Sequence, residues 1–355
     1  MNRIVSFDFL RFVLAICVVI GHSYLVLCRQ SETDLLVLQN LAVDGFFILS
    51  GFLLALSYFH TQSAGKPEDL FFDATRKRVK RLYPEYLFAM IITWAISEFF
   101  LNQHVPSFVF PLNLMFIAQI NGVPGIINGS WYVSVLFWVG SVYSALLYYQ
   151  NKTAQYVWVP LLVFCSFSYC FAIYTGLSLN SLPLVGGFFS VGFFKGIMAM
   201  GCGILLFFVC HFLQEKPLSF KYKNVIFIIL EALAVFVLIS CFKRTYLSQK
   251  EYLVYFAFPV LIGIYYFHKE VLTSFFSLKL WKPLTDLAYT LFLVHVPVLE
   301  LAKKYVFENQ PGGGGCSLYT SFGYYLCRFC VCLFSCAEAV VCEIKKMAGG
   351  LRGEA

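Results

Sequence analysis

The sequence predicts an all-α, polytopic transmembrane protein with about ten spans and both termini in the cytoplasm. Of its 355 residues, 60% are hydrophobic, 19% are aromatic and only 13% are charged. A soluble core does not bury that much apolar surface, whereas a bundle of membrane-spanning helices exposes it to lipid. The gaps between the apolar runs are short. We therefore expect one transmembrane domain over residues 1–345 and a short cytoplasmic tail over residues 346–355.

Ten apolar stretches define the expected spans. They lie near residues 7–28, 40–59, 85–101, 131–149, 156–175, 190–213, 225–242, 252–267, 285–302 and 318–341. The segments on the side that includes both termini hold 17 of the Lys and Arg residues, and those on the other side hold 6. Basic residues accumulate on the cytoplasmic side of membranes, which places both termini there. The first run is long and lacks a small-residue cleavage pattern, so we expect a span and not a signal peptide.

The first expected span contains three ionisable residues, Asp8, Arg11 and His22. A charged side chain inside a membrane costs about 3 kcal/mol on insertion scales unless it is paired or faces a wet cavity, so it marks a functional site by default. Eleven residues make about three helical turns and about 16 Å of rise. Arg11 and His22 therefore lie on one helix face, about half a bilayer apart. Asp8 precedes Arg11 by one turn, where the two side chains can pair.

The second expected span is interrupted by Asp44, Ser50 and Gly51. Asp44 enters from the side that His22 approaches, so its carboxylate is a candidate partner for the imidazole. A helix start is the alternative interpretation of Asp44. For Ser50 and Gly51, close helix approach is favoured over chemistry, because small residues let helices pack closely in lipid.

A basic segment, RKRVKRLYPEYL over residues 76–87, precedes the third span. It is either a topological anchor that contacts anionic lipid or a phosphate site. Arg78 and Arg81, three residues apart, form one fork on a helical turn and favour the phosphate site. Pro84 fits the first turn of the following helix, where a missing N–H costs nothing.

Residues 102–130 contain no Lys, Arg, Asp or Glu. Such a Pro- and Asn-bearing loop is too apolar to float in water, so we expect it to pack over the membrane face or re-enter it. Trp131 follows at an interface. The ninth expected span contains Tyr289 and His295, and a lone membrane histidine more often joins helices than catalyses. None of the 13 cysteines has metal-ligand spacing with a histidine, so we expect no metal.

Four segments resemble, in order, the integral-membrane acyltransferase 3 family, the bacterial O-acyltransferases of cell-surface sugars. They are FDFLRFVLAICVVIGH at 7–22, VDGFFILSGFLL at 43–54, RKRVKRLYPEYL at 76–87 and YTLFLVHVP at 289–297. The first resembles the family's Arg-x10-His signature and the third its Arg-x-x-Arg motif. Three features depart from the family: Tyr132 follows Trp131 where Ser is common, Phe292 stands where tyrosine is usual, and the Cys-rich C-terminal stretch matches nothing.

The resemblance implies a multi-pass O-acetyltransferase of the bacterial inner membrane. Acetyl-CoA would be the acyl donor, and the acceptor would be a hydroxyl of a polysaccharide, lipopolysaccharide or glycolipid of the cell envelope. The expected partners are this acceptor and the lipid bilayer, without nucleic acid. The alternative is a transporter or flippase of a lipid-linked sugar, although the sequence has no convincing internal repeat.

The resemblance also implies roles for the residues singled out above. His22 would be the catalytic base or a transient acyl carrier, and Arg11 and Asp44 would complete the catalytic group. Arg78 and Arg81 would bind the nucleotide phosphates. The remaining candidates would contact substrate or support the site, and they are Asp8, Ser50, Trp131, Tyr289 and His295.

Overall fold

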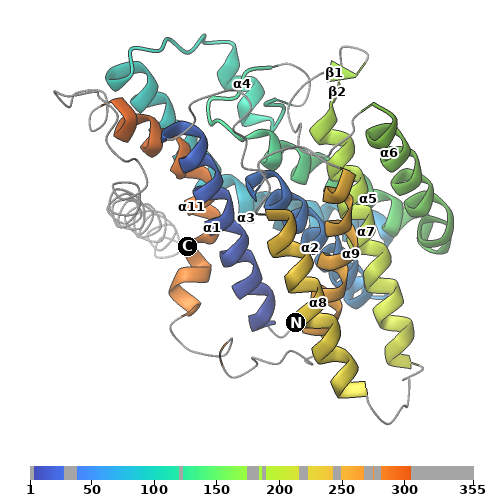
Figure 1. Cartoon of the computed structure of the whole chain (residues 1–355). Coiled ribbons are helices and arrows are strands. Elements are labelled where there is room, and N and C mark those ends of the chain that lie inside the picture. The colour runs from blue at the N-terminus through green and yellow to red at the C-terminus, as the bar shows by residue number, and fades with distance from the viewer. Residues whose placement is uncertain are drawn as a thin grey trace.

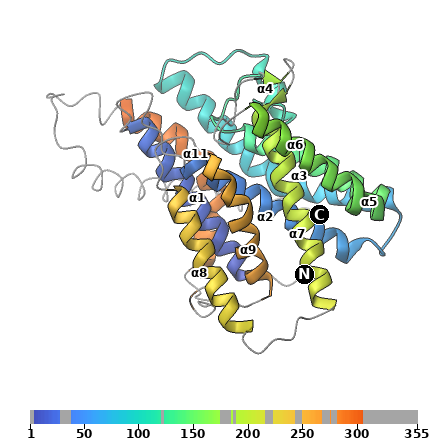
Figure 2. The same ribbon diagram turned by 45° about the vertical axis from the view of Figure 1, so that its right-hand side comes forward.

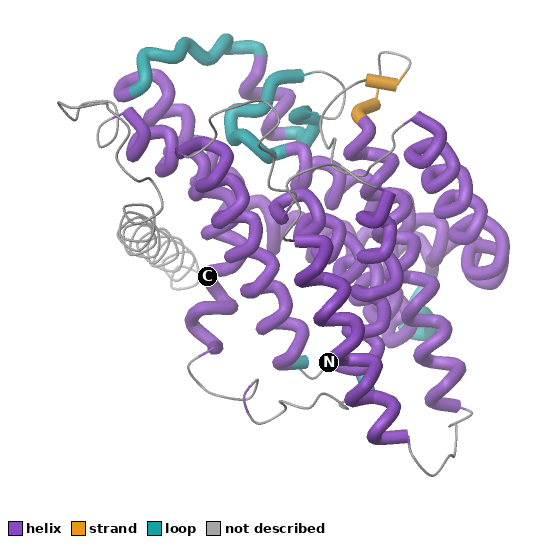
Figure 3. Tube along the Cα trace, viewed as in Figure 1, coloured by secondary structure: helices purple, strands orange, loops and turns teal. Residues whose placement is uncertain are grey.

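The computed structural model describes residues 4–27, 38–119, 123–173, 184–185, 189–215, 223–242, 249–267, 275 and 281–304. Apart from loops and one hairpin of two short strands, these residues are helical (Figures 1 and 3). The elements in order are α1 (Val5–Leu27), α2 (Leu38–Thr61), α3 (Pro67–Ala95), a π-helix (Ile96–Phe100), α4 (Val109–Leu114), α5 (Trp131–Thr153), a π-helix (Ala154–Trp158), α6 (Val159–Ile173), β1 (Leu184–Val185), β2 (Phe189–Ser190), α7 (Val191–Glu215), α8 (Lys223–Phe242), a 3-10 helix (Gln249–Leu253), α9 (Val254–Tyr266) and α11 (Trp281–Ala302). The all-α class is confirmed.

Each of the first nine expected spans overlaps a helix, and the tenth lies outside the described residues, as does the expected tail. Five helical segments of the described chain are long and apolar enough to cross a membrane, and they are Val5–Ser23, Asn40–Thr61, Trp131–Phe171, Val191–Glu215 and Asn224–Phe242. Glu251–Tyr266 and Leu287–Ala302 are shorter apolar helices. The chain is therefore a multi-pass membrane protein, and the count of ten spans and the cytoplasmic termini stay predictions.

The basic segment and the third span form one helix, α3, so the prediction that Pro84 begins a helix is wrong. The helix begins at Pro67, with Glu68 and Asp69 in its first turn, and Pro84 lies inside it. A proline at the first helical position and acidic residues beside it are the usual start signals. As a result, the arginines before Pro84 are held on the same helix as the apolar residues after it.

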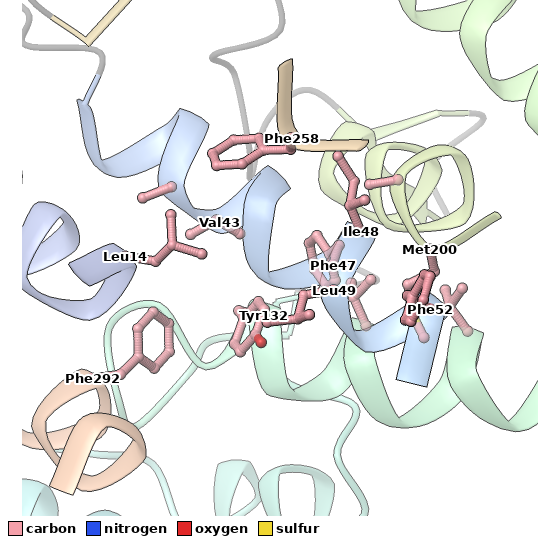
Figure 4. Close-up of a cluster of buried hydrophobic side chains, with 14 of the residues drawn as sticks. Leu14, Val43, Phe47, Ile48, Leu49, Phe52, Tyr132, Met200, Phe258 and Phe292 are labelled. Atoms are coloured by element: carbon pink, nitrogen blue, oxygen red, sulfur yellow. The ribbon is translucent and has the colours of Figure 1, made fainter. Parts of the chain in front are cut away.

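Helix α2 lies at the centre of the bundle and packs closely against α7 (Figures 1 and 2). A Cβ atom at Gly51 would collide with the carbonyl oxygen of Met200, and one at Gly203 with that of Ile48. The two backbones are therefore in direct contact, which only glycine permits at these positions. The interpretation of Gly51 as a close-approach residue is confirmed. Around this contact lie the buried side chains of Phe47 and Phe52 (Figure 4).

Helices α1 and α11 lie side by side and run in the same direction (Figures 1 and 2). Near their N-termini, the rings of Phe9 and Trp281 have centroids 4.9 Å apart. Near their C-terminal ends, the rings of His22 and His295 are 5.0 Å apart. A parallel pair is what the expected first and ninth spans require. It brings together two motifs that are more than 250 residues apart.

The uncharged segment before α5 is fixed by hydrogen bonds of its own side chains, and its expected place over the membrane face stays a prediction. The Asn113 side chain is fully buried and donates to the carbonyl oxygens of Val109 and Pro124, at 2.8 and 3.0 Å. Its oxygen accepts the backbone N–H of Ile126 at 3.0 Å. Farther along, the Gln119 side-chain oxygen accepts the backbone N–H of Trp131 at 3.2 Å. These bonds satisfy backbone groups that would otherwise be unpaired away from water.

Candidate active site

Helices α1, α2, α3, α5 and α11 enclose a cavity of about 530 Å³, to which α7 contributes one residue. This volume lies in the usual range for small-molecule sites, roughly 300–1,000 Å³. The lining residues are Asp8, Arg11, Phe46, Ser50, Leu53, Leu54, Ser57, Ala74, Lys77, Arg78, Arg81, Leu82, Glu85, Tyr132, Leu136, Met200, Thr285, Ala288, Tyr289 and Phe292. The cavity thus gathers six of the predicted site residues from four helices.

Basic side chains exceed acidic ones in this lining. The cations are Arg11, Lys77, Arg78 and Arg81, and the carboxylates are Asp8 and Glu85. The other basic residues of the same helical turns, Arg76 and Lys80, do not line the cavity. One face of α3 therefore carries charge into the cavity while another presents it outside. An excess of cations in a cleft attracts anionic ligands such as phosphates.

Arg78 is held in place by α5. Its guanidinium donates to the hydroxyl groups of Ser141 at 3.4 Å and Ser144 at 3.2 Å. Gly140 makes this possible, because a Cβ atom there would lie 2.9 Å from a guanidinium nitrogen. Burial and the neighbouring charge of Arg81 lower the pKa of Arg78 to about 10, so it stays charged at neutral pH. Serine hydroxyls orient the group without neutralising it.

On the other side of the cavity, Arg11 forms the ion pair expected with Asp8, at 2.9 Å between Nη1 and Oδ1. Two hydrogen bonds join α11 to α3 beside it. The Tyr289 hydroxyl donates to the Leu82 carbonyl at 3.3 Å, and the Thr290 hydroxyl donates to the Glu85 carboxylate at 2.7 Å. These two bonds hold α11 against α3 at residues that line the cavity or adjoin it.

His22 and His295 contact each other at 3.0 Å between Nδ1 of His22 and Nε2 of His295. Nδ1 of His295 lies 2.7 Å from the Phe292 carbonyl. A carbonyl only accepts, so this Nδ1 carries a proton and, in a neutral ring, Nε2 is an acceptor. Nδ1 of His22 then donates to it, while also lying 3.2 Å from the Val18 carbonyl. This assignment leaves the lone pair of His22 on Nε2, which makes no hydrogen bond within the described residues.

Three aromatic rings of the cavity lining contact one another, and one of them also contacts the histidine pair. Phe46, Tyr132 and Phe292 line the cavity and contact one another, with centroid distances of 5.9, 6.2 and 4.9 Å. Phe292 also contacts the His295 ring at 5.9 Å. Figure 4 shows Tyr132 and Phe292 beside α2. The basic cavity and the two histidines are therefore neighbours on α1 and α11, and Phe292 contacts both.

Two predicted site residues lie elsewhere. The fully buried carboxylate of Asp44 pairs with Lys195 at 3.1 Å, so the ring partner of His22 in the structure is His295 and not Asp44. Trp131 packs against Phe47, with ring centroids 6.0 Å apart, and does not line the cavity. Asp44 is drawn to Lys195 because a buried charge needs an opposite one.

Sequence reasoning missed four residues of this region: Lys77, Glu85, Tyr132 and Phe292. Spacing along α3 offered a signal for Lys77, because it precedes Arg81 by four residues and shares its helix face. Phe292 had a comparable signal, since it precedes His295 by three residues on α11. For Tyr132 the sequence offered none, because its place depends on how α5 meets α2 and α11.

Comparison with known proteins agrees with this geometry. The model of an acyltransferase domain, that of the acyltransferase 3 family, matches residues 4–338. No curated protein and no solved structure matches the chain. The matched range contains the cavity, the histidine pair and every predicted site residue. The chain therefore belongs to the acyltransferase 3 family and is a membrane acyltransferase.

Proposed function

We propose that this protein transfers an acetyl group from acetyl-CoA to a hydroxyl of a cell-envelope polysaccharide or glycolipid, at the inner membrane of a bacterium. The observation that carries the proposal is the contact between His22 and His295 on the helix faces that also line a basic cavity. A base and an anion-binding site on neighbouring parts of the same helices are what transfer from a phosphate-bearing thioester requires. Family membership favours this reaction over the transporter alternative.

The donor fits the charges of the cavity. Coenzyme A carries phosphates on its nucleotide and a long, uncharged arm that ends in the thioester. In this proposal Lys77, Arg78 and Arg81 bind the phosphates. The arm extends along the face of α1 that runs from Arg11 to His22, about 16 Å. Arg11, oriented by Asp8, then stabilises negative charge that develops on the donor.

His22 acts as the general base in the transfer step. Its Nε2 takes the proton of the acceptor hydroxyl, and the oxygen attacks the thioester carbonyl carbon. The C–O bond forms, the C–S bond breaks, and the thiolate of CoA leaves and takes up the proton. His295 is a positioning residue, because its Nε2 accepts from Nδ1 of His22 and so keeps the lone pair on the reacting nitrogen. The alternative is that His22 is a transient acyl carrier. It would then receive the acetyl group from the donor first and pass it to the acceptor.

The test is acetyl transfer from labelled acetyl-CoA in membranes that contain wild-type protein or His22→Gln at equal abundance. His60 provides a matched control, because it is exposed at the end of α2. We expect wild type and His60→Gln to label a glycan or lipid fraction and His22→Gln to lose at least about 10²-fold of the rate. Equal labelling by all three proteins would contradict the proposal. If none of the three proteins labels a fraction, the result would favour the transporter alternative.

A further inference from the structure

We propose that the three rings of Phe46, Tyr132 and Phe292 form a constriction that admits only a small acyl group to His22, and that Phe292 sets its size. The inference rests on the proposed function, because it concerns the acyl group of that reaction. It begins from the position of the rings along the cavity. On α2, Ser57 and Phe46 are the two ends of the lining, eleven residues apart, and on α11 they are Thr285 and Phe292, seven residues apart.

The aromatic end of this lining is the end nearest the histidines. Thr285, Tyr289, Phe292 and His295 follow one another at helical spacing on one face of α11, and all but His295 line the cavity. Phe292 is 6% exposed, and its ring touches both Tyr132 and His295. Phe292 thus joins the cavity lining to the histidine pair.

The size limit follows from packing. Phe292 contacts Phe46 in an edge arrangement at 6.2 Å and Tyr132 at 4.9 Å. Rings at these distances are in contact, so nothing passes between them without a side-chain rotation. In this proposal the arm of the donor occupies the gap that the rotation opens, and the acyl group has to fit beyond it, between Phe292 and the histidines, where each further methylene needs more displaced volume. Of the three rings, Phe292 is the one that contacts both the barrier and the histidine pair.

The experiment compares acetyl-, butyryl- and hexanoyl-CoA as donors for wild type, Phe292→Ala and Phe292→Leu in purified, detergent-solubilised full-length protein. Phe256→Ala is the control, because Phe256 is 72% exposed on α9. We expect the ratio of butyryl to acetyl transfer, as kcat/KM, to rise by about tenfold or more in Phe292→Ala. The rise should be smaller in Phe292→Leu, which retains more apolar volume, and absent in Phe256→Ala.

Each outcome separates the two proposals. If wild type transfers acetyl and the donor ratio stays unchanged in folded Phe292→Ala and Phe292→Leu, the constriction is overturned and the acyltransferase proposal stands. If wild type transfers no acyl group from any CoA thioester, the proposed function itself fails. If Phe292→Ala does not fold, the donor ratio of Phe292→Leu decides. A ratio equal to that of wild type in that variant rejects the constriction.

Discussion

Replacing Arg81 by glutamine tests whether the basic face of α3 binds the donor or merely anchors the helix to lipid. Both Arg81 and its neighbour Lys80 are exposed, but Arg81 lines the cavity and Lys80 does not. Both substitutions remove one positive charge from the same helical turn. If the basic face is a surface anchor, the two substitutions should have equal effects on KM for acetyl-CoA. If it is a phosphate site, only Arg81→Gln should raise this KM.

The expected magnitude comes from one charged hydrogen-bonding contact. Such a contact contributes about 1.5–3 kcal/mol, which corresponds to an increase of about 10- to 150-fold in KM for acetyl-CoA, given that about 1.4 kcal/mol is tenfold. Lys80→Gln should change KM by less than about twofold, because Lys80 does not line the cavity and an exposed charge away from the donor contributes little. The kcat of Arg81→Gln should change less than its KM, since in this account Arg81 binds the phosphates and not the reacting thioester.

The assay is steady-state acetyl transfer by purified protein in lipid nanodiscs, with two donors. Acetyl-CoA carries the nucleotide phosphates, and S-acetylpantetheine carries the thioester arm without them. Arg81→Gln should weaken only the use of acetyl-CoA. Equal losses with both donors, or an equal rise in KM for Lys80→Gln, would refute the assignment of a phosphate site.

Three further predictions concern the fold that holds the site, and all are read as thermal unfolding of the detergent-solubilised protein. Gly51→Ala should destabilise the fold by about 1–3 kcal/mol, since its Cβ atom would meet the α7 backbone. Gly263→Ala should be nearly neutral, because its Cβ atom would meet only ordinary contacts at 3.7 Å or more. Equal shifts in melting temperature for the two variants would contradict the close approach of α2 and α7. Lys195→Met should cost about 3–5 kcal/mol by leaving Asp44 unpaired, and adding Asp44→Asn should recover part of the loss, an outcome that an unimportant ion pair would not give. Asn113→Ala should cost about 1–3 kcal/mol because it leaves the buried backbone N–H of Ile126 without its acceptor, and an unchanged melting temperature would show that the loop does not depend on it.

The helices and the part of the site on α1 were predictable, because they depend on residues that are close in the sequence. Apolar runs of span length predicted α1 and α2, and helical periodicity placed Arg11 and His22 on one face. The pairing of Arg11 with Asp8 is likewise a contact between residues one turn apart, and the structure contains it. The course of α3 was less accessible, because the start signals at Pro67 competed with Pro84.

Contacts between residues far apart in the sequence could not be predicted, because composition does not say which helices pack against each other. Asp44 approaches the same side of the bundle as His22, yet it forms an ion pair with Lys195 from α7. His295 reaches His22 across 273 residues of sequence, through the parallel packing of α1 and α11. The ring layer of Tyr132 and Phe292 depends on the same packing. Such contacts come from tertiary structure alone.

The most direct test of the central claim is a double-mutant cycle on the two histidines, measured as kcat for acetyl transfer. We expect His22→Gln and His295→Leu each to lower kcat by about 10²–10⁴-fold, because one removes the base and the other the acceptor that orients it. His295→Gln, whose amide oxygen can accept from Nδ1, should retain more activity than His295→Leu. The double variant should be no slower than the slower single variant, since the pair acts as a unit. Wild-type kcat in folded His22→Gln, or losses that simply multiply, would contradict the account.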